Sequence, residues 1–396
     1  MNTFHLDSIK HSEDGHRIDM EVRIGEDRHQ IFFSSQNAIL HYDLDSLLAF
    51  SLPVCMVKRA DWLPEGQLNK EILEKLPAIM DFIQAWKPRL YRPKLPNITP
   101  VTRSANHSSG VGLFFTGGVD SFFTLYKYFD RITHLVYIHG LEMSLDKRTM
   151  RQKISQMLQR VGKEMGKGII EIETNLRKFT FNYASRNVTH GFELAGIAYL
   201  LQDYFSEVWI ANGVTYDQMR PSSLHPDITP LLQSDVMKIM FDGHDLTRLE
   251  KTAILARGTE YLSEIPKDFV EITQEQSKLA METLRICNEN RGDAYNCGTC
   301  QKCLRTMIDL RLVNALELCP TFAKPLDLKR IRRMDLSNSS NASFIKQSLH
   351  ELERTKRDPE LKTVLHEALD NNKPLKQLKR WVARLKWRRY ARKNWY

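Results

Sequence analysis

Short apolar runs alternate with helix-length segments through the middle of the chain, and this alternation limits the possible folds most. Segments with helical periodicity lie near 119–129, 147–165 and 192–204. Strands that alternate with such helices form right-handed crossovers and a parallel sheet covered on both faces. We therefore predict an α/β fold with a Rossmann-like parallel sheet that binds ligands at the carboxyl ends of its strands. The predicted strands are Val111–Phe115, Leu135–Ile138, Ile169–Ile172 and Val208–Ile210.

The segments that flank this alternation predict further regions. Alternating apolar positions and a charged turn within 18–33 indicate a hairpin, and a helical stretch follows near 69–86. Prolines and small polar residues then indicate a linker. A polar run at 337–343 sets off a last group of helices. The predicted regions are a small N-terminal α+β module at 1–88, a linker at 89–110, the α/β domain at 111–320 and a helical, basic C-terminal region at 321–396.

The positive charge of the chain is concentrated at its end. The formal net charge is +9, but ten Lys or Arg and no acidic residue lie between Lys373 and Lys393, so the rest is nearly neutral. Apolar residues at helical spacing, interleaved with Trp and Tyr, make 373–396 a basic amphipathic segment. This tail is predicted to lie on an anionic membrane surface, to bind RNA, or to dock on the protein itself.

No apolar run reaches 18 residues, and the N-terminus lacks the charged-then-apolar pattern of a secretory signal. We therefore predict a cytoplasmic protein. If the basic tail lies on an anionic membrane surface, the protein would be peripheral at that membrane.

A glycine-rich turn joins the first predicted strand of the α/β domain to its helix. Two adjacent glycines let the backbone turn tightly and present N–H groups, with the helix N-terminus, to an anion. Thr116 and Ser121 add hydroxyl donors, and Asp120 is suited to orient Mg²⁺ or to cap the helix. A plain turn with an aspartate cap is the alternative, and the chain has no Walker A motif. The turn is Thr116, Gly117, Gly118, Val119, Asp120 and Ser121.

Four of the six cysteines lie close together in the sequence. Four thiolates suit a closed tetrahedral zinc site, the last three of them are separated by two residues each, and Gly298 relaxes the turn between two of them. An iron–sulfur cluster or unliganded thiols are the alternatives. Cys55 and Cys319 are predicted to be ordinary buried thiols. The predicted zinc ligands are Cys287, Cys297, Cys300 and Cys303.

These motifs resemble known proteins. The turn is similar to the SGGxDS signature of the PP-loop ATP pyrophosphatases (adenine nucleotide alpha hydrolase-like), with Thr116 in place of Ser. The cysteines, followed by Leu304 and Arg305, resemble the zinc knuckle of 7-cyano-7-deazaguanine synthases. Uncharacterised PP-loop proteins share the His225–Pro226 and Asp242–Gly243 elements. The resemblance covers roughly 111–310 and implies a PP-loop (HUP-type) domain whose turn holds the pyrophosphate end of ATP.

Further site residues follow from the strand ends and from this resemblance. His139 ends the second predicted strand and is a candidate base or phosphate contact, while Gly213 follows the fourth. Arg248 and Lys251 resemble a family segment and would act as catalytic cations beside Asp120, neutralising the departing pyrophosphate. A buried histidine, a polar loop and a solvated helix face are the structural alternatives.

The resemblance also implies an activity. It predicts an ATP-dependent ligase, or amidotransferase-like enzyme, that adenylates a carboxylate or carbonyl oxygen of a small-molecule acceptor, releases AMP and pyrophosphate, and transfers nitrogen from ammonia or another donor. The front module and the basic tail depart from the deazaguanine synthases and leave the acceptor open. The alternatives are a PP-loop enzyme acting on RNA or tRNA and a catalytically silent nucleotide-binding module. The sequence leaves the oligomeric state open, and a homodimer is one of the options.

Overall fold

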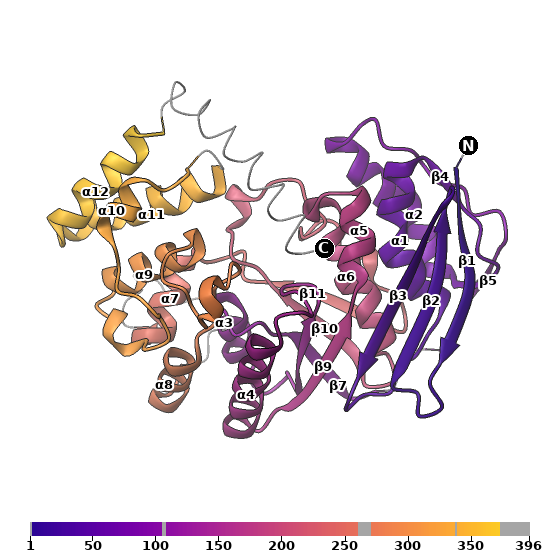
Figure 1. Cartoon of the computed structure of the whole chain (residues 1–396), viewed down its shortest axis with the longest axis horizontal. Helices are drawn as coiled ribbons and strands as arrows, with labels where there is room; N and C mark the ends of the chain where they lie inside the picture. The colour runs from indigo at the N-terminus through magenta and orange to yellow at the C-terminus, as the bar shows by residue number, and fades with distance from the viewer. Residues whose placement is uncertain (1, 105–107, 260–270, 337–338, 373–396) are drawn as a thin grey trace.

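A computed structural model of the protein describes residues 2–104, 108–259, 271–336 and 339–372 (Figure 1). Its strands are β1 Asn2–His11, β2 Arg17–Ile24, β3 Asp27–Ser35, β4 Ala60–Trp62, β5 Gly66–Asn69, β6 Ile98–Val101, β7 Gly110–Phe114, β8 His134–His139, β9 Gly168–Thr174, β10 Phe205–Ala211 and β11 Lys238–Asp242. Its α-helices are α1 Leu44–Lys58, α2 Lys70–Trp86, α3 Val119–Lys127, α4 Arg148–Met165, α5 Leu176–Tyr183, α6 Arg186–Leu200, α7 Arg248–Arg257, α8 Gln274–Thr283, α9 Gln301–Leu312, α10 Leu328–Arg332, α11 Ser339–Thr355 and α12 Pro359–Asp370.

In the described part of the chain, nine strands form one sheet in the order β11-β10-β7-β8-β9-β3-β2-β1-β4. The first five in this order run parallel to one another. The chain moves from β7 through β8 to β9 on one side of β7, and β10 then pairs with the other side. The position between β7 and β10 is therefore a topological switch point, where α/β folds bind ligands at the carboxyl ends of the strands.

The predicted α/β fold with a mostly parallel central sheet is confirmed. Strands β7 to β10 and helices α3, α4 and α6 occupy the segments that the alternating pattern indicated. The hairpin of β2 and β3 and helix α2 also lie where they were predicted.

The N-terminal strands differ from the prediction of a separate module, because they extend the central sheet. β3 pairs antiparallel with β9, with Phe33 opposite Thr174. Asn175 reinforces this junction, since its side chain accepts from the Phe32 N–H (2.9 Å) and donates to the Gln30 carbonyl (2.8 Å). The predicted linker is also partly ordered, because β6 pairs with β5.

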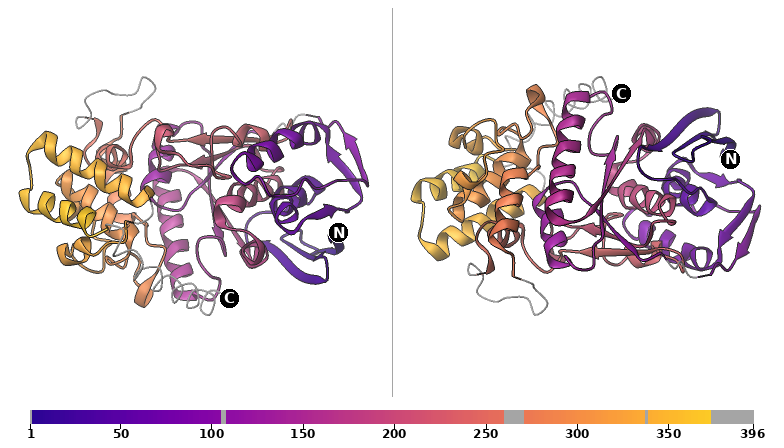
Figure 2. Two further views of the ribbon diagram at one scale, coloured as in Figure 1. Left: turned by 90° about the horizontal axis from the view of Figure 1, so that it is seen from above. Right: turned by 90° about the horizontal axis from the view of Figure 1, so that it is seen from below.

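Helices cover both faces of the parallel strands, and the sheet separates the hydrophobic core into two clusters. Side chains alternate along β7, so that Leu113 packs with α3, α4 and the C-terminal helices, while Phe114 packs with α1, α2 and α6. The C-terminal helices form one end of the elongated molecule and the N-terminal strands form the other (Figure 2).

The C-terminal helices pack directly on the body of the protein. Ile345, Leu349 and Leu352 of α11 belong to the same buried cluster as Leu113 of β7. Residues 339–343 of the polar run, predicted to set these helices apart, instead begin α11. The basic tail at 373–396 lies outside the described residues. Within the described residues, every helix is too short or too polar to cross a bilayer.

Candidate active site

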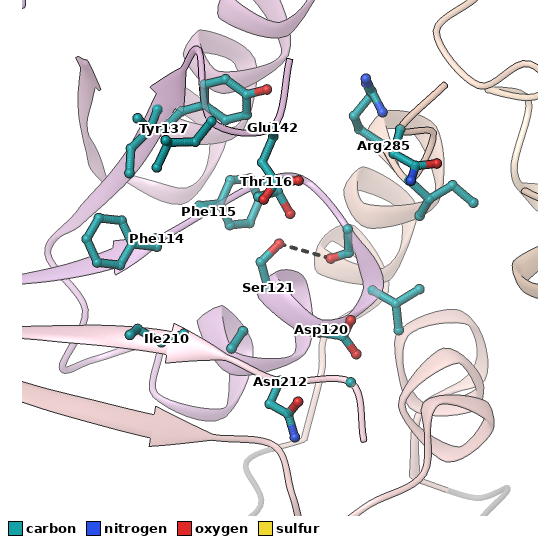
Figure 3. A pocket seen from close by; sticks show the side chains of 18 of the residues that line it. Phe114, Phe115, Thr116, Asp120, Ser121, Tyr137, Glu142, Ile210, Asn212 and Arg285 are labelled. Carbon is teal, nitrogen blue, oxygen red and sulfur yellow. Dashed lines mark hydrogen bonds between the residues drawn. The ribbon is translucent and has the colours of Figure 1, made fainter. Parts of the chain in front are cut away.

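A cavity of about 320 Å³ lies at the carboxyl ends of β7, β8 and β10, at the topological switch point (Figure 3). Its wall combines charged side chains with an apolar surface. The apolar part comes from the strand ends and from α6. The polar part comes from the turn after β7, the loop after β10 and the segment that carries the cysteines. The charged residues that line it are Asp120, Glu142, Arg186, Arg248, Arg285 and Lys302, together with His190.

The glycine-rich turn forms one side of this cavity. Gly117 has φ +72°, and a Cβ there would lie 2.7 Å from Met157 Cε, so a glycine is required. Gly118 is the N-cap of α3 and has no side chain to cap the first N–H groups of the helix. Ser121 Oγ donates to the Gly118 carbonyl at 3.1 Å (Figure 3). Free backbone donors at a helix N-terminus, facing a cavity, are the geometry that binds anions.

The structure brings five of the six predicted turn residues to the wall of the cavity. Gly117 shapes the turn from behind, and the other five line the cavity: Thr116, Gly118, Val119, Asp120 and Ser121.

Asp120 and Arg248 form an ion pair on the cavity wall. Burial opposes ionisation of Asp120, but Arg248 and Lys251 outweigh it and lower the pKa of the carboxyl. The second carboxylate oxygen, Oδ1, is buried and has no partner among the described residues. Gly213, also predicted, lines the cavity beside this pair and leaves no room for a side chain. The site thus holds an ionised carboxylate with one oxygen free for a further ligand.

A second charged group lies on the wall formed by α6 and the loop after β8. Glu142 pairs with Arg186 and lies 3.4 Å from Nε2 of His190. Burial opposes ionisation of Glu142, but Arg186 and His190 hold its pKa well below the ordinary value. Nδ1 of His190 lies 3.3 Å from Glu193, which also accepts from Arg177. The imidazole therefore sits between two carboxylates, and the Arg186 guanidinium also contacts its Nε2 at 2.9 Å.

Two predicted site residues lie elsewhere, and these assignments are corrected. His139 does not line the cavity: it is buried toward α4, where its Nε2 lies 2.8 Å from Glu171, which also accepts from Ser155. Lys251 is fully buried behind the loops, and its Nζ donates to the carbonyls of Asn212 (2.7 Å) and Gly243. Lys251 therefore fixes the loop after β10 and lowers the pKa of Asp120 from a distance.

The four clustered cysteines are brought together, as predicted. Their sulfurs lie within 4.8 Å of one another, with 3.8 Å between Cys287 and Cys300 and 3.9 Å between Cys297 and Cys303. A tetrahedral zinc ion with bonds of about 2.3 Å requires sulfurs about 3.8 Å apart. Backbone N–H groups also approach Cys297 and Cys300, at 3.3 and 3.4 Å, and such donors stabilise thiolates. This buried cluster fits a metal ion such as zinc. Cys55 and Cys319 are free and buried, as predicted.

The cysteine-bearing segment closes the cavity. The backbone N–H of Arg285 donates to the carbonyl of Gly117 at 2.7 Å, which ties the segment to the glycine-rich turn. The Arg285 guanidinium donates to the carbonyl of Cys287 and to Asn290. Burial lowers the pKa of Lys302 to about 8, while Glu142 acts in the opposite direction. The cysteine cluster and the cavity thus share a wall.

Sequence reasoning did not identify Glu142, Arg285 or Lys302 as site residues. The sequence position of Lys302 could have identified it as a candidate, because it lies between two of the clustered cysteines. Glu142 and Arg285 stand in segments without a motif, and only the tertiary contacts bring them to the cavity. Comparison of the chain with protein-family models, curated proteins and solved structures gave no match.

Proposed function

We propose that this protein is an ATP-dependent enzyme that activates a small-molecule oxygen by adenylation and then transfers nitrogen to it. The observation that carries the proposal is the glycine-rich turn, whose uncapped helix N-terminus faces a charged cavity at the switch point of the sheet. Backbone N–H groups in this position bind phosphate oxyanions. The proposal thus assigns the turn to the phosphates of the nucleotide.

The charges around the turn support phosphoryl chemistry. Asp120 is ionised and has one unpartnered oxygen, so it fits a Mg²⁺ ion that accompanies the phosphates and neutralises part of their charge. Arg248 shares this wall, where its fixed guanidinium stabilises negative charge on the leaving pyrophosphate. Lys251 positions the loop after β10 rather than contacting the phosphates.

In the proposed reaction, an acceptor oxygen attacks the α-phosphorus of ATP. The bond from this phosphorus to the bridging oxygen breaks, and pyrophosphate leaves with the electron pair. Ammonia, or another nitrogen donor, then attacks the activated carbon. AMP leaves with the acceptor oxygen, and the nitrogen loses a proton. Both displacements need fixed positive charge near the leaving group, which the arginines of the cavity supply.

The rest of the cavity suits a compact acceptor. Ile210, Leu194 and Leu224 give it an apolar wall, and the Arg186 guanidinium lies on the same side. An apolar surface with a few convergent polar groups is typical of sites for small molecules. A small carboxylate would match this combination.

The test is product analysis with the full-length protein. We expect AMP and pyrophosphate, not ADP and phosphate, when the protein is incubated with Mg-ATP, ammonia and a panel of small carboxylates. Asp120→Ala should lower this turnover by at least about 100-fold and leave the melting temperature near that of the wild type. Asp130→Ala, at an exposed position just beyond α3, is the matched control and should keep full activity.

Each other outcome has a clear meaning. Nucleotide binding without any turnover would identify a silent binding module. Unchanged AMP formation in Asp120→Ala would remove Asp120 from the mechanism. Formation of ADP would refute adenylation.

A further inference from the structure

The cysteine-bearing segment places a lysine in the cavity. Gln301, Lys302 and Cys303 begin α9, and consecutive side chains of a helix point about 100° apart. Nε2 of Gln301 donates to the carbonyl of Asp335 at 3.0 Å, and the sulfur of Cys303 faces the other cysteines. Lys302, between them, lines the cavity. The start of one helix therefore contacts the C-terminal helices, the metal cluster and the cavity in turn.

The ammonium group of Lys302 has no direct partner. Among the described residues, no hydrogen bond or ion pair holds it. It interacts electrostatically with Glu142 and Asp120, but these carboxylates are already paired with Arg186 and Arg248. The side chain of Lys302 is only partly exposed, and an unpaired ammonium that has lost part of its hydration is costly. A negatively charged ligand in the cavity would remove this cost.

We infer that Lys302 binds phosphate oxygens of the nucleotide, so that the metal ion held by the four cysteines keeps a phosphate-binding residue in place. The inference rests on the proposed function. It favours phosphate over the acceptor because Lys302 lines the cavity and belongs to the segment whose Arg285 backbone N–H donates to the carbonyl of Gly117 in the glycine-rich turn. A lysine, as a compact point charge, is well suited to phosphate.

The inference makes metal binding and phosphate binding interdependent. A metal ion bound by the four cysteines would fix the first turn of α9, because Cys300 is the N-cap of this helix and Cys303 lies in its first turn. If the metal ion holds Lys302 in its binding position, metal binding raises the affinity for polyphosphate. Bound polyphosphate must then raise the affinity for the metal by the same factor, since such coupling is reciprocal. Pyrophosphate should therefore slow the loss of zinc.

Calorimetry on the zinc-loaded, full-length protein tests the contact. Lys302→Ala should weaken binding of Mg-ATP and of pyrophosphate by at least about 10-fold, whereas adenosine, which has no phosphate, should bind as to the wild type. Lys302→Arg should recover most of the affinity because it restores the charge. Lys346→Ala, at an exposed position on α11, is the matched control and should bind like the wild type. Each variant should retain one zinc ion.

The second readout is the rate at which a chelator removes zinc. We expect pyrophosphate to slow this removal in the wild type and in Lys346→Ala, but not in Lys302→Ala or Lys302→Gln. If neither neutral variant folds, zinc removal from the wild type decides, and a rate insensitive to pyrophosphate overturns the inference.

The two proposals fail differently. Equal affinity of the wild type and Lys302→Ala for pyrophosphate overturns the role of Lys302 and leaves the proposed function standing. A wild type that binds neither Mg-ATP nor pyrophosphate overturns both.

Discussion

The substitution Gly213→Ala tests the geometry of the cavity with a single methyl group. A Cβ at this position would lie 2.2 Å from Nη2 of Arg248 and 2.7 Å from Oδ2 of Asp120. Both distances are far below normal contact, so the guanidinium and the carboxylate must move apart. Gly213 does not have a left-handed backbone, and therefore alanine causes no strain of its own.

The magnitude follows from what has to move. Both clashing atoms are the ends of flexible side chains whose exposed fractions are 14% and 18%, so the fold tolerates their displacement. The ligand loses at least one charge-assisted hydrogen bond, worth about 1.5–3 kcal/mol. We therefore expect affinity for Mg-ATP to fall about 10- to 150-fold.

Calorimetric titration with Mg-ATP and thermal unfolding measure the two effects. Gly166→Ala is the control: a Cβ there meets nothing within 4 Å, but φ is +63°, which costs about 1–2 kcal/mol in strain. The control should lose stability and keep its affinity, whereas Gly213→Ala should lose affinity and keep most of its stability. Normal binding by Gly213→Ala would refute the assignment of Asp120 and Arg248 to the ligand site.

Two further predictions concern the metal cluster and α6. Cys300→Ser should lose zinc and unfold or aggregate, because metal binding supplies folding energy, while Cys55→Ala should retain one zinc ion per chain; a soluble, metal-free Cys300→Ser protein with native melting would contradict this. Burial opposes ionisation of Glu193, but Arg177 and His190 lower the pKa of its carboxyl from 4.5 to about 2. The ionised carboxylate therefore stabilises the folded protein fully above pH 4.5, and this stabilisation is lost as the pH falls toward 2. This contribution is about 3 kcal/mol, and Glu193→Gln should flatten the dependence of the unfolding free energy on pH between 5 and 3; equal slopes for the two proteins would count against it.

Local patterns determined much of the architecture. The strands and helices of the α/β region follow from hydrophobic periodicity, which is a property of neighbouring residues, and so their positions could be predicted. The four cysteines could be assigned to one predicted metal site because two-residue spacings already bring three of the sulfurs together. The glycine-rich turn was recognisable for the same reason, since two adjacent glycines between a strand and a helix form a local sequence pattern.

Contacts between distant segments could not be predicted in this way. That β3 joins β9 depends on Asn175, more than 140 positions from the Gln30 and Phe32 backbone groups that it bridges. The misassignment of His139 and Lys251 has the same origin. Their sequence positions at a strand end and a helix start suit a ligand site, but His139 is bonded to Glu171 outside the cavity and two loop carbonyls hold the ammonium of Lys251 in the interior.

The sequence by itself determined an α/β chain with a glycine-rich turn before a helix and four clustered cysteines that suit a metal ion. Only the tertiary structure decided that these two features share one cavity, because the backbone of Arg285 bonds to Gly117 across 168 positions of the chain. A motif specifies the local shape of a few residues, whereas the cost of burying charges such as Glu193 and Lys251 is set by the groups that the fold places opposite them.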